Sequence, residues 1–258
     1  MRLNTGTRER FEYSGISIAG VRAVNEDAWC AAPVNEGLLV CAVADGIGGH
    51  EAGDVASALA IRIFEETVRE AEIAAGDHET SAEVLRRGHT LAHEAILKQA
   101  TGKRFGMGTT LVSACFEDGE VTLCNTGDSR CTLIRKGTVK PLTKDHSFVQ
   151  DLVDRGVLTQ EEAASHPMGN IITHSLGADF AADCGAHPLC DGDTLVISSD
   201  GLHDYTSQET MIAAGGAVTA DEAARLLMEE AARTSTDNIT LIIVRVHSEA
   251  IHNTPGRE

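Results

Sequence analysis

Aromatic residues are scarce in this sequence: only 3 % of its 258 residues are Phe, Trp or Tyr. Proteins that stack single-stranded nucleic acid need aromatic faces, so this composition disfavours that class of function. Basic residues are also few, because 21 Lys and Arg stand against 39 Asp and Glu and give a formal net charge of −18. Such a surface repels a phosphate backbone, and we expect no nucleic acid partner.

Cysteine pairs with metal-ligand spacing are absent. The chain has seven cysteines and no C-x-x-C pair, and four of them lie in apolar or alternating runs, as small buried hydrophobes do: Cys41, Cys115, Cys124 and Cys131. The sequence therefore predicts neither a disulfide framework nor a zinc ribbon. A reducing, cytoplasmic location fits this usage of cysteine.

Long apolar runs are missing as well. No stretch approaches the roughly 18 apolar residues of a membrane span, and the first residues, MRLNTGTRERFEYSG, have no apolar core. We expect neither a signal peptide nor a membrane partner. No repeat, low-complexity tract or Pro/Ser-rich linker divides the chain, which predicts a single domain over residues 1–258.

The apolar patterns that are present predict both strands and helices. Helical spacing begins near Glu51 and recurs over 80–100, over 147–166 with a break at Gly156, and over 220–233. Strands are predicted over 15–19, 28–32, 37–45, 108–116, 120–126, 130–135, 193–200 and 238–246. The three central strands look like consecutive antiparallel hairpins. The order favours an α+β fold, a four-layer α-β-β-α sandwich of two antiparallel sheets flanked by helices.

Acidic residues stand where apolar strands meet turns that contain Gly or Asn. They are Glu26, Asp27, Asp45, Asp200 and Asp237. A strand end is a rigid support, and a following Gly lets the backbone approach an ion closely. Oxygen ligands suit Mg²⁺ or Mn²⁺ better than zinc. Any one Asp-Gly pair alone is a common turn signal, but four such segments together indicate a cation site.

Seven motifs in order resemble the PPM (PP2C-type) protein phosphatases, most closely the compact bacterial members, over residues 12–247. They are RAVNED from Arg22, DGIGG from Asp45, GTT from Gly108, GDSR from Gly127, LTKDH from Leu142, SDGL from Ser199 and DNI from Asp237. The resemblance implies a metal-dependent enzyme that hydrolyses phosphoserine and phosphothreonine on proteins. Its partners would be phosphoprotein substrates and a cognate Ser/Thr kinase whose action it opposes.

The resemblance also implies a role for each acid. Asp45 would bridge two Mn²⁺ or Mg²⁺ ions as a catalytic residue, and the carbonyl of Gly46 would ligate one of them. Asp200 and Asp237 would complete the shell of the other ion. Asp128 would join Asp200 at a third, weaker metal site found in bacterial relatives.

The remaining members of the site would act around these ions. Glu26 and Asp27 would work mainly through metal-bound waters, and Arg22 would hold the substrate phosphate with its planar fork. Two ions roughly 3.5–4 Å apart can share a water and lower its pKa towards about 7, which supplies a nucleophile at neutral pH. Supporting residues would be Thr109, Thr110 and Asn238.

The sequence departs from some family members directly after Asp45-Gly46, where they have His and this chain has Ile47. The proton for the leaving group must then come from metal-bound water or another side chain, with His50 as a weak candidate. Residues 147–170 match the variable flap of bacterial relatives. Two interpretations of that flap stay open, namely selection or gating of substrates and simple packing at the sandwich edge.

Other interpretations also stay open from the sequence alone. Asp128, Arg22 and the Glu26-Asp27 pair could each be ordinary turn or surface residues, and we expect Asp145-His146 to have a structural role at the base of the site. The protein could be a pseudophosphatase that binds a phosphoprotein as a regulator, although such proteins usually lose metal carboxylates. It could also be another two-metal hydrolase such as a phosphodiesterase, but a nuclease would need a more basic surface.

Overall fold

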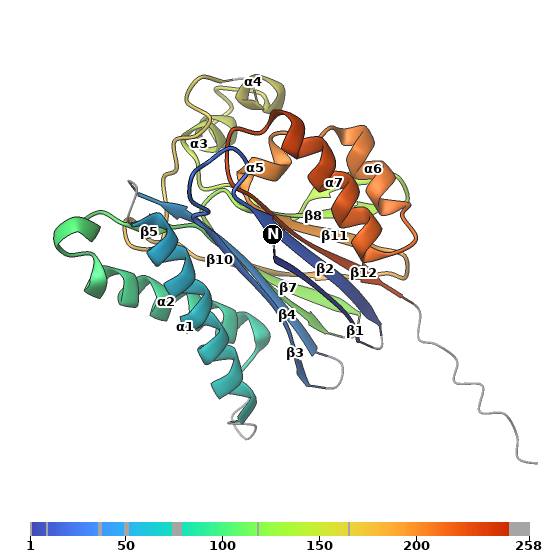
Figure 1. Ribbon diagram of the computed structural model, residues 1–258, viewed down its shortest axis with the longest axis horizontal. Coiled ribbons are helices and arrows are strands. Elements are labelled where there is room, and N and C mark those ends of the chain that lie inside the picture. Colours follow the sequence, from blue (N-terminus) through green and yellow to red (C-terminus); the bar gives the residue numbers. More distant parts are fainter. Residues whose placement is uncertain are drawn as a thin grey trace, which may run out of the picture.

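A computed structural model describes residues 2–8, 10–35, 38–48, 52–73, 79–117, 119–164 and 166–247 (Figure 1). Two antiparallel sheets form its centre. The first has the strand order β1 (Arg2–Arg8), β2 (Phe11–Ile18), β12 (Ile239–Val246), β11 (Thr194–Ser198), β8 (Arg130–Arg135) and β9 (Thr138–Pro141). The second has the order β10 (Asp183–Pro188), β7 (Glu120–Thr126), β6 (Leu111–Glu117), β4 (Leu38–Ile47) and β3 (Asp27–Asn35), and the short β5 (Gly108–Thr109) pairs with β4.

Helices cover the outer face of each sheet, which confirms the predicted four-layer α-β-β-α sandwich (Figure 1). The helices α1 (Gly53–Ile73) and α2 (Ser81–Gln99) pack on the second sheet. The helices α5 (Asp200–His203), α6 (Gln208–Gly215) and α7 (Ala220–Thr234) pack on the first. A 3₁₀ turn (Gly102–Arg104) precedes β5, while α3 (Phe148–Asp154) and α4 (Gln160–Ala164) lie beyond one end of the sheets (Figure 1).

Three apolar clusters hold these layers together. The cluster between the sheets includes Phe11, Phe116 and Ile242, all almost fully buried. Phe64 belongs to the cluster under α1 and α2, and Leu227 to the cluster under α7. Burying each such side chain contributes roughly 1.5–3 kcal/mol, so the sandwich is a rigid frame for whatever its strand ends present.

The predicted hairpin between 120–126 and 130–135 is wrong. β7 pairs with β6 and β10, whereas β8 pairs with β9 and β11 in the other sheet. The chain therefore crosses between sheets at Thr126–Ser129. Gly127 has φ +103°, and a Cβ there would lie 2.7 Å from Cγ2 of Thr110, so only glycine fits. A turn and a crossing use the same small polar residues, which is why the sequence pattern did not separate them.

The flap segment folds as predicted. Its two short helices are α3 and α4, and Thr159 caps α4 reciprocally with Glu162. The Thr159 N–H donates to Oε2 of Glu162 at 2.8 Å, and the Glu162 N–H donates to Oγ1 of Thr159 at 3.2 Å. The N-cap of α3 is Ser147, so the preceding Asp145 and His146 are not its caps.

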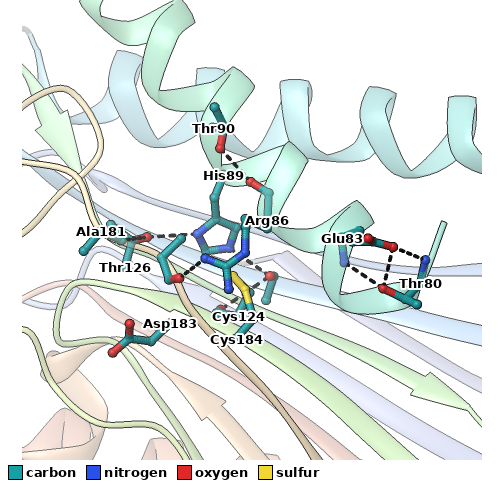
Figure 2. Close-up of a disulfide and its surroundings, with 12 residues drawn as sticks. Thr80, Glu83, Arg86, His89, Thr90, Cys124, Thr126, Ala181, Asp183 and Cys184 are labelled. Carbon is teal, nitrogen blue, oxygen red and sulfur yellow. Dashed lines mark hydrogen bonds between the residues drawn. A yellow bond between two sulfur atoms is a disulfide. The ribbon is translucent and has the colours of Figure 1, made fainter.

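The prediction that Cys124 is an unpaired buried thiol is wrong. Cys124 in β7 forms a disulfide with Cys184 in β10, its direct partner in the strand register (Figure 2). The two cysteines are 60 residues apart, and β10 was not predicted as a strand, so the sequence did not bring them together. Cys41, Cys115 and Cys131 are free and buried as predicted. No helix in the described part of the chain is long and apolar enough to cross a bilayer.

Candidate functional site

Five of the predicted acids meet at one end of the sandwich. Asp27 begins β3 directly opposite Asp45 in β4, Asp200 follows β11, and Asp237 precedes β12. Asp128 lies in the crossing from β7 to β8. Both sheets therefore contribute acids to the same place. The charges of Asp27, Asp200, Asp128 and Asp237 all act on Asp45, so the structure brings these five carboxyl groups within electrostatic reach of one another.

Asp45 stands at the centre of this group. Burial raises the pKa of its carboxyl well above the ordinary range, and the charges of the other four acids raise it further: Asp27, Asp200, Asp128 and Asp237. The backbone of Asp45 is fixed by Thr109, at the end of β5, and by Thr110 directly after it. Its N–H donates to Oγ1 of Thr110 at 2.9 Å, and its carbonyl accepts from Oγ1 of Thr109 at 2.8 Å. The two threonines thus fix the residue on which the charges of the other four acids act.

Asp27 is anchored by a residue that the sequence analysis did not single out. Oγ of Ser199 donates to Oδ2 of Asp27 at 2.9 Å. Burial is the main cause that raises the pKa of Asp27 to about 7, and the charges of Asp200 and Asp237 add to it. Its other oxygen, Oδ1, is buried and has no hydrogen-bond partner among the described residues. The only sequence signal for Ser199 is its place directly before Asp200.

Asp200 and Asp128 form the other side of the group. Burial raises the pKa of Asp200, and the charge of Asp237 raises it further, while a hydrogen bond with Asp45 opposes the shift. Oδ1 of Asp200 is also buried without a partner in the described structure. Burial and the charges of Asp200 and Asp145 raise the pKa of Asp128 to about 8. A carboxyl group is costly to bury beside others unless a cation neutralises it.

Gly46 and Glu26 pack tightly against the start of α1. The Gly46 N–H donates to the carbonyl of Glu26 at 3.2 Å. A Cβ at Gly46 would lie 2.3 Å from the carbonyl oxygen of Gly53, so no side chain fits there. The carboxyl of Glu26 lies against Gly53, at the positive end of the helix dipole. Glu26 is thus held beside the acid group. The charge of Glu26 is not among the causes that raise the pKa of Asp45 or of Asp27.

Arg22 lies on the rim of the site. Its Nη2 is 2.8 Å from Oδ2 of Asp237, and its Nε donates to the carbonyl of Thr236 at 2.9 Å. The guanidinium side chain is 50 % exposed, so a phosphate arriving from solvent can reach it. Asn238 holds the loop that presents Arg22. Its Oδ1 accepts the Glu26 N–H at 2.8 Å, and its Nδ2 donates to the carbonyls of two loop residues, Ala19 and Val24.

A cavity of about 520 Å³ lies between the acid group and the flap. Asp128, Asp200 and Arg130 line it on one side, and residues of α3 and α4 on the other. Arg130 holds Asp145 with two bonds, Nε to Oδ1 at 2.9 Å and Nη2 to Oδ2 at 2.6 Å. This is the structural role expected for Asp145. Arg130 was not predicted as a site residue, although it ends the GDSR motif.

The acid group fits divalent cations. Two of its carboxylate oxygens are buried without partners among the described residues, and its side-chain donors are all oxygens. No three His, Cys, Asp or Glu side chains within the described ranges are arranged to hold one ion by themselves. Mg²⁺ usually keeps several waters and takes only one or two carboxylates, so a hydrated site suits this spacing. His50 lies outside the described residues, and Ile47 ends β4 opposite Gly108.

The family model for protein phosphatase 2C matches residues 15–237. The chain belongs to the protein phosphatase 2C family. It is 33 % identical over 232 residues to a serine/threonine phosphatase (Stp) of Listeria welshimeri, covering 87 % of this chain and 91 % of that protein. The crystal structure of the serine/threonine phosphatase PstP of Mycobacterium tuberculosis superposes with a TM-score of 0.81 at 35 % identity, covering 93 % of this chain and all of that one. A PstP catalytic domain in complex with two manganese ions gives 0.79 at 34 % identity, over 93 % and 99 % of the two chains.

Proposed function

We propose that the acid group performs metal-dependent hydrolysis of phosphoserine and phosphothreonine on proteins. The chain is a metal-dependent protein phosphatase of the PP2C type, as its family and its relatives named serine/threonine phosphatases indicate. The observation that supports this site most directly is the convergence of five acids from both sheets, two with buried, unpartnered oxygens. Such a group is electrostatically unfavourable without cations. Its presence in the fold therefore supports cation binding.

The residues assigned to the cations are those that converge. Asp45 and the carbonyl of Gly46 would hold one ion, and Asp45, Asp200 and Asp237 the other, in part through water, because no three side chains of the described residues are arranged to hold an ion by themselves. Asp128 with Asp200 would hold a third. When bound, Mn²⁺ or Mg²⁺ lowers the pKa of water and offsets negative charge on the phosphoryl group. Asp27, fixed by Ser199, would accept a hydrogen bond from water at its free oxygen, and Glu26 would do so from the start of α1.

Arg22 would orient the substrate phosphate. Its side chain is already held by Asp237 and the carbonyl of Thr236, so little conformational freedom is lost when the phosphate binds. Ile47 has no ionisable group, and the proton for the leaving serine or threonine oxygen must come from water or from another side chain. The cavity beneath the flap is placed to receive the peptide around the phosphorylated residue.

The pseudophosphatase alternative is not favoured. A binding module without catalysis has no need of five clustered acids, and Asp45, Asp200 and Asp237 are all present and coupled. Two finer statements remain part of the proposal: the enzyme opposes a Ser/Thr kinase of the same cell, and it works in the cytoplasm. A phosphoproteome compared with and without the protein would identify the sites that it and the kinase share.

The test of the proposed function is hydrolysis of a phosphothreonine peptide with Mn²⁺. We expect turnover that EDTA abolishes and that falls at least about a hundredfold in Asp45→Asn or Asp200→Asn. Asp191→Asn is the matched control, because Asp191 is 58 % exposed and bonds Arg10 away from the acid group. Folded protein without turnover at saturating Mn²⁺, or full activity in Asp45→Asn, would refute the proposal.

A further inference from the structure

The disulfide between Cys124 and Cys184 ties down an otherwise weakly held strand. β10 is the outermost strand of its sheet and pairs only with β7. None of its six residues is buried: four are exposed, and only Cys184 and His187 are partly covered. Besides the backbone ladder, the described side-chain hydrogen bonds hold only the two ends of this strand, from His146 to Asp183 and from Arg135 to the carbonyl of Pro188. An exposed edge strand of this kind is expected to open more easily than the strands inside the sheet. The covalent bond to Cys124 is the strongest link between β10 and the sheet (Figure 2).

The segment that leads into β10 touches the crossing that carries Asp128. Oγ1 of Thr126, at the end of β7, donates to the carbonyl of Ala181 at 2.6 Å. Nη1 of Arg86 in α2 donates to the next carbonyl, that of Ala182, at 2.5 Å (Figure 2). The chain just before Cys184 is thus fastened both to the crossing and to α2.

A second connection runs through His146. The backbone N–H of Gly127 donates to the ring atom Nδ1 of His146 at 3.3 Å, and the backbone N–H of His146 donates to the Gly127 carbonyl at 2.9 Å. Because Nδ1 is the acceptor, Nε2 carries the proton and donates to Oδ2 of Asp183 at 3.2 Å. Asp183 is the first residue of β10, and Gly127 directly precedes Asp128. Through His146, the start of β10 is thus linked to the residue directly before Asp128.

We propose that Cys124 and Cys184 form a thiol–disulfide exchange site for a dithiol reductant, and that reduction releases β10 and weakens cation binding at Asp128. The second part rests on the proposed role of Asp128 as a metal ligand. The disulfide would then report the thiol redox state of the surroundings to a site just beyond the same end of β7, because Cys124 lies four residues before Asp128.

The exchange proceeds at Cys184, because Cys124 is fully buried and Cys184 is partly exposed. A thiolate of the dithiol attacks Sγ of Cys184, the bond between the two protein sulfurs breaks, and Cys124 leaves and takes up a proton. The second thiol of the reductant then attacks the mixed disulfide and frees Cys184. The dithiol loses two electrons and becomes a disulfide, while the protein gains two thiols. Hydrogen peroxide reverses the change by accepting two electrons and leaving as two waters.

The other cysteines do not compete for this chemistry. Burial raises the pKa of Cys131 to about 12, and burial also raises that of Cys115 to about 12, so neither forms a thiolate near neutral pH. Cys190 is free and exposed, but it lies outside β10 and has no described sulfur partner. Cys190 therefore serves as the matched control, because it is an accessible thiol that takes no part in the disulfide.

The test measures amide hydrogen exchange in metal-free protein with and without dithiothreitol, with thiol alkylation to count open disulfides. We expect reduction to speed exchange of the amides of residues 183–187 by about tenfold, and to speed it less at 125–128. Cys184→Ser should match the reduced protein whether or not dithiothreitol is present, and Cys190→Ser should match the wild type. Calorimetric titration with Mn²⁺ should then show weaker binding in the reduced protein.

Each arm can overturn one part of the proposal. Alkylation of both cysteines shows that the bond is open. If the amides of residues 183–187 then exchange as fast as they do in the oxidised protein, and no faster, the tether is refuted. This arm needs neither metal nor turnover. If both Cys124 and Cys184 of the wild type can still be alkylated after air oxidation, the disulfide has not formed and the exchange site is refuted. If Asp128→Asn binds Mn²⁺ as the wild type does, the ligand role of Asp128 fails and with it the coupling to cations. Because reduction is applied to the folded wild type, the result does not depend on whether Cys184→Ser folds.

Discussion

Asp27 and Asp45 lie directly opposite each other on the antiparallel strands β3 and β4. Residues paired in this way have Cα atoms only about 4.5–5.5 Å apart, and like charges there destabilise the sheet. The pair also faces Asp200 and Asp237, so repulsion spreads over both sheets. Cations bound between these strand ends would offset the repulsion.

Cations should therefore stabilise the fold. We expect Mn²⁺ at a hundred times its dissociation constant to add about 2.7 kcal/mol to the free energy of unfolding. The Asp45→Asn variant should be more stable than the wild type without metal, because it removes the charge that all the others face, and it should gain less from Mn²⁺. Thermal unfolding with Mn²⁺ and with EDTA measures both effects. An unchanged melting temperature on adding Mn²⁺ to the wild type would contradict this prediction.

Gly46→Ala should be strongly destabilising. The added methyl group would lie 2.3 Å from the Gly53 carbonyl oxygen and 2.6 Å from that of Glu26, and both are backbone atoms that cannot move alone. We expect a loss of about 2 kcal/mol or more in urea unfolding, together with weaker Mn²⁺ binding. Gly185→Ala is the control, since nothing lies within 4 Å of its Cβ position. Equal stability of the two variants would show that the α1 start can shift away from β4.

Arg22→Ala should raise KM more than it lowers kcat. The guanidinium binds the phosphate in both the substrate and the transition state, and a bond to a charged group contributes roughly 1.5–3 kcal/mol. We expect KM for a phosphothreonine peptide to rise about tenfold. Arg22→Lys should recover only part of the loss, because an ammonium lacks the planar fork. Arg62→Ala is the control, as Arg62 pairs with Glu66 on the exposed face of α1. A fall in kcat alone would place Arg22 outside phosphate binding.

His89 should make the protein less stable in mild acid. It is fully buried between Oγ1 of Thr126 and Oγ of Ser113, at 3.0 and 2.9 Å, and burial lowers its pKa to about 3. The unfolded chain takes up a proton near pH 6.5 and the folded protein does not. As far as His89 is concerned, the free energy of unfolding is therefore highest above pH 6.5. It decreases as the pH falls towards 3, by up to about 1.4 kcal/mol per pH unit.

Urea unfolding between pH 4 and pH 7 tests the role of His89. His89→Gln keeps hydrogen-bonding groups at this place and has no proton to bind, so its stability should depend less on pH than that of the wild type. His166→Gln is a suitable control because His166 lies in the flap and no buried network depends on it. An identical pH slope in His89→Gln and the wild type would show that His89 is not the buried group that resists protonation.

The sequence predicted the layers and most of the acid group because those signals are local. Apolar strands with Asp-Gly or Asp-Asn at one end are visible within a few residues, as at Asp45, Asp200 and Asp237. The hydrogen bond from Ser199 to Asp27 and the ion pair of Arg22 with Asp237 span 172 and 215 residues, so no local pattern could indicate them. The change of sheet at Gly127 was missed because its residues are also those of a tight turn.

The disulfide was missed for a related reason. β10 exposes most of its side chains and so lacks the alternation by which a strand is found in a sequence. Without β10, Cys184 had no place beside β7, and Cys124 was interpreted as an ordinary buried thiol. Edge strands held by backbone bonds leave the weakest trace in the amino-acid pattern.

The position of β12 sets the order in which a growing chain can complete this molecule. β12 lies between β2 and β11 in the first sheet, although it is the last strand in the described sequence. During synthesis β2 must wait for more than 200 further residues before residues 11–18 meet their partners at 239–246. Asp237 and Asn238 leave the ribosome at the same late moment. The acid group is therefore incomplete in the nascent chain until Asp237 has been synthesised and β12 has paired with β2.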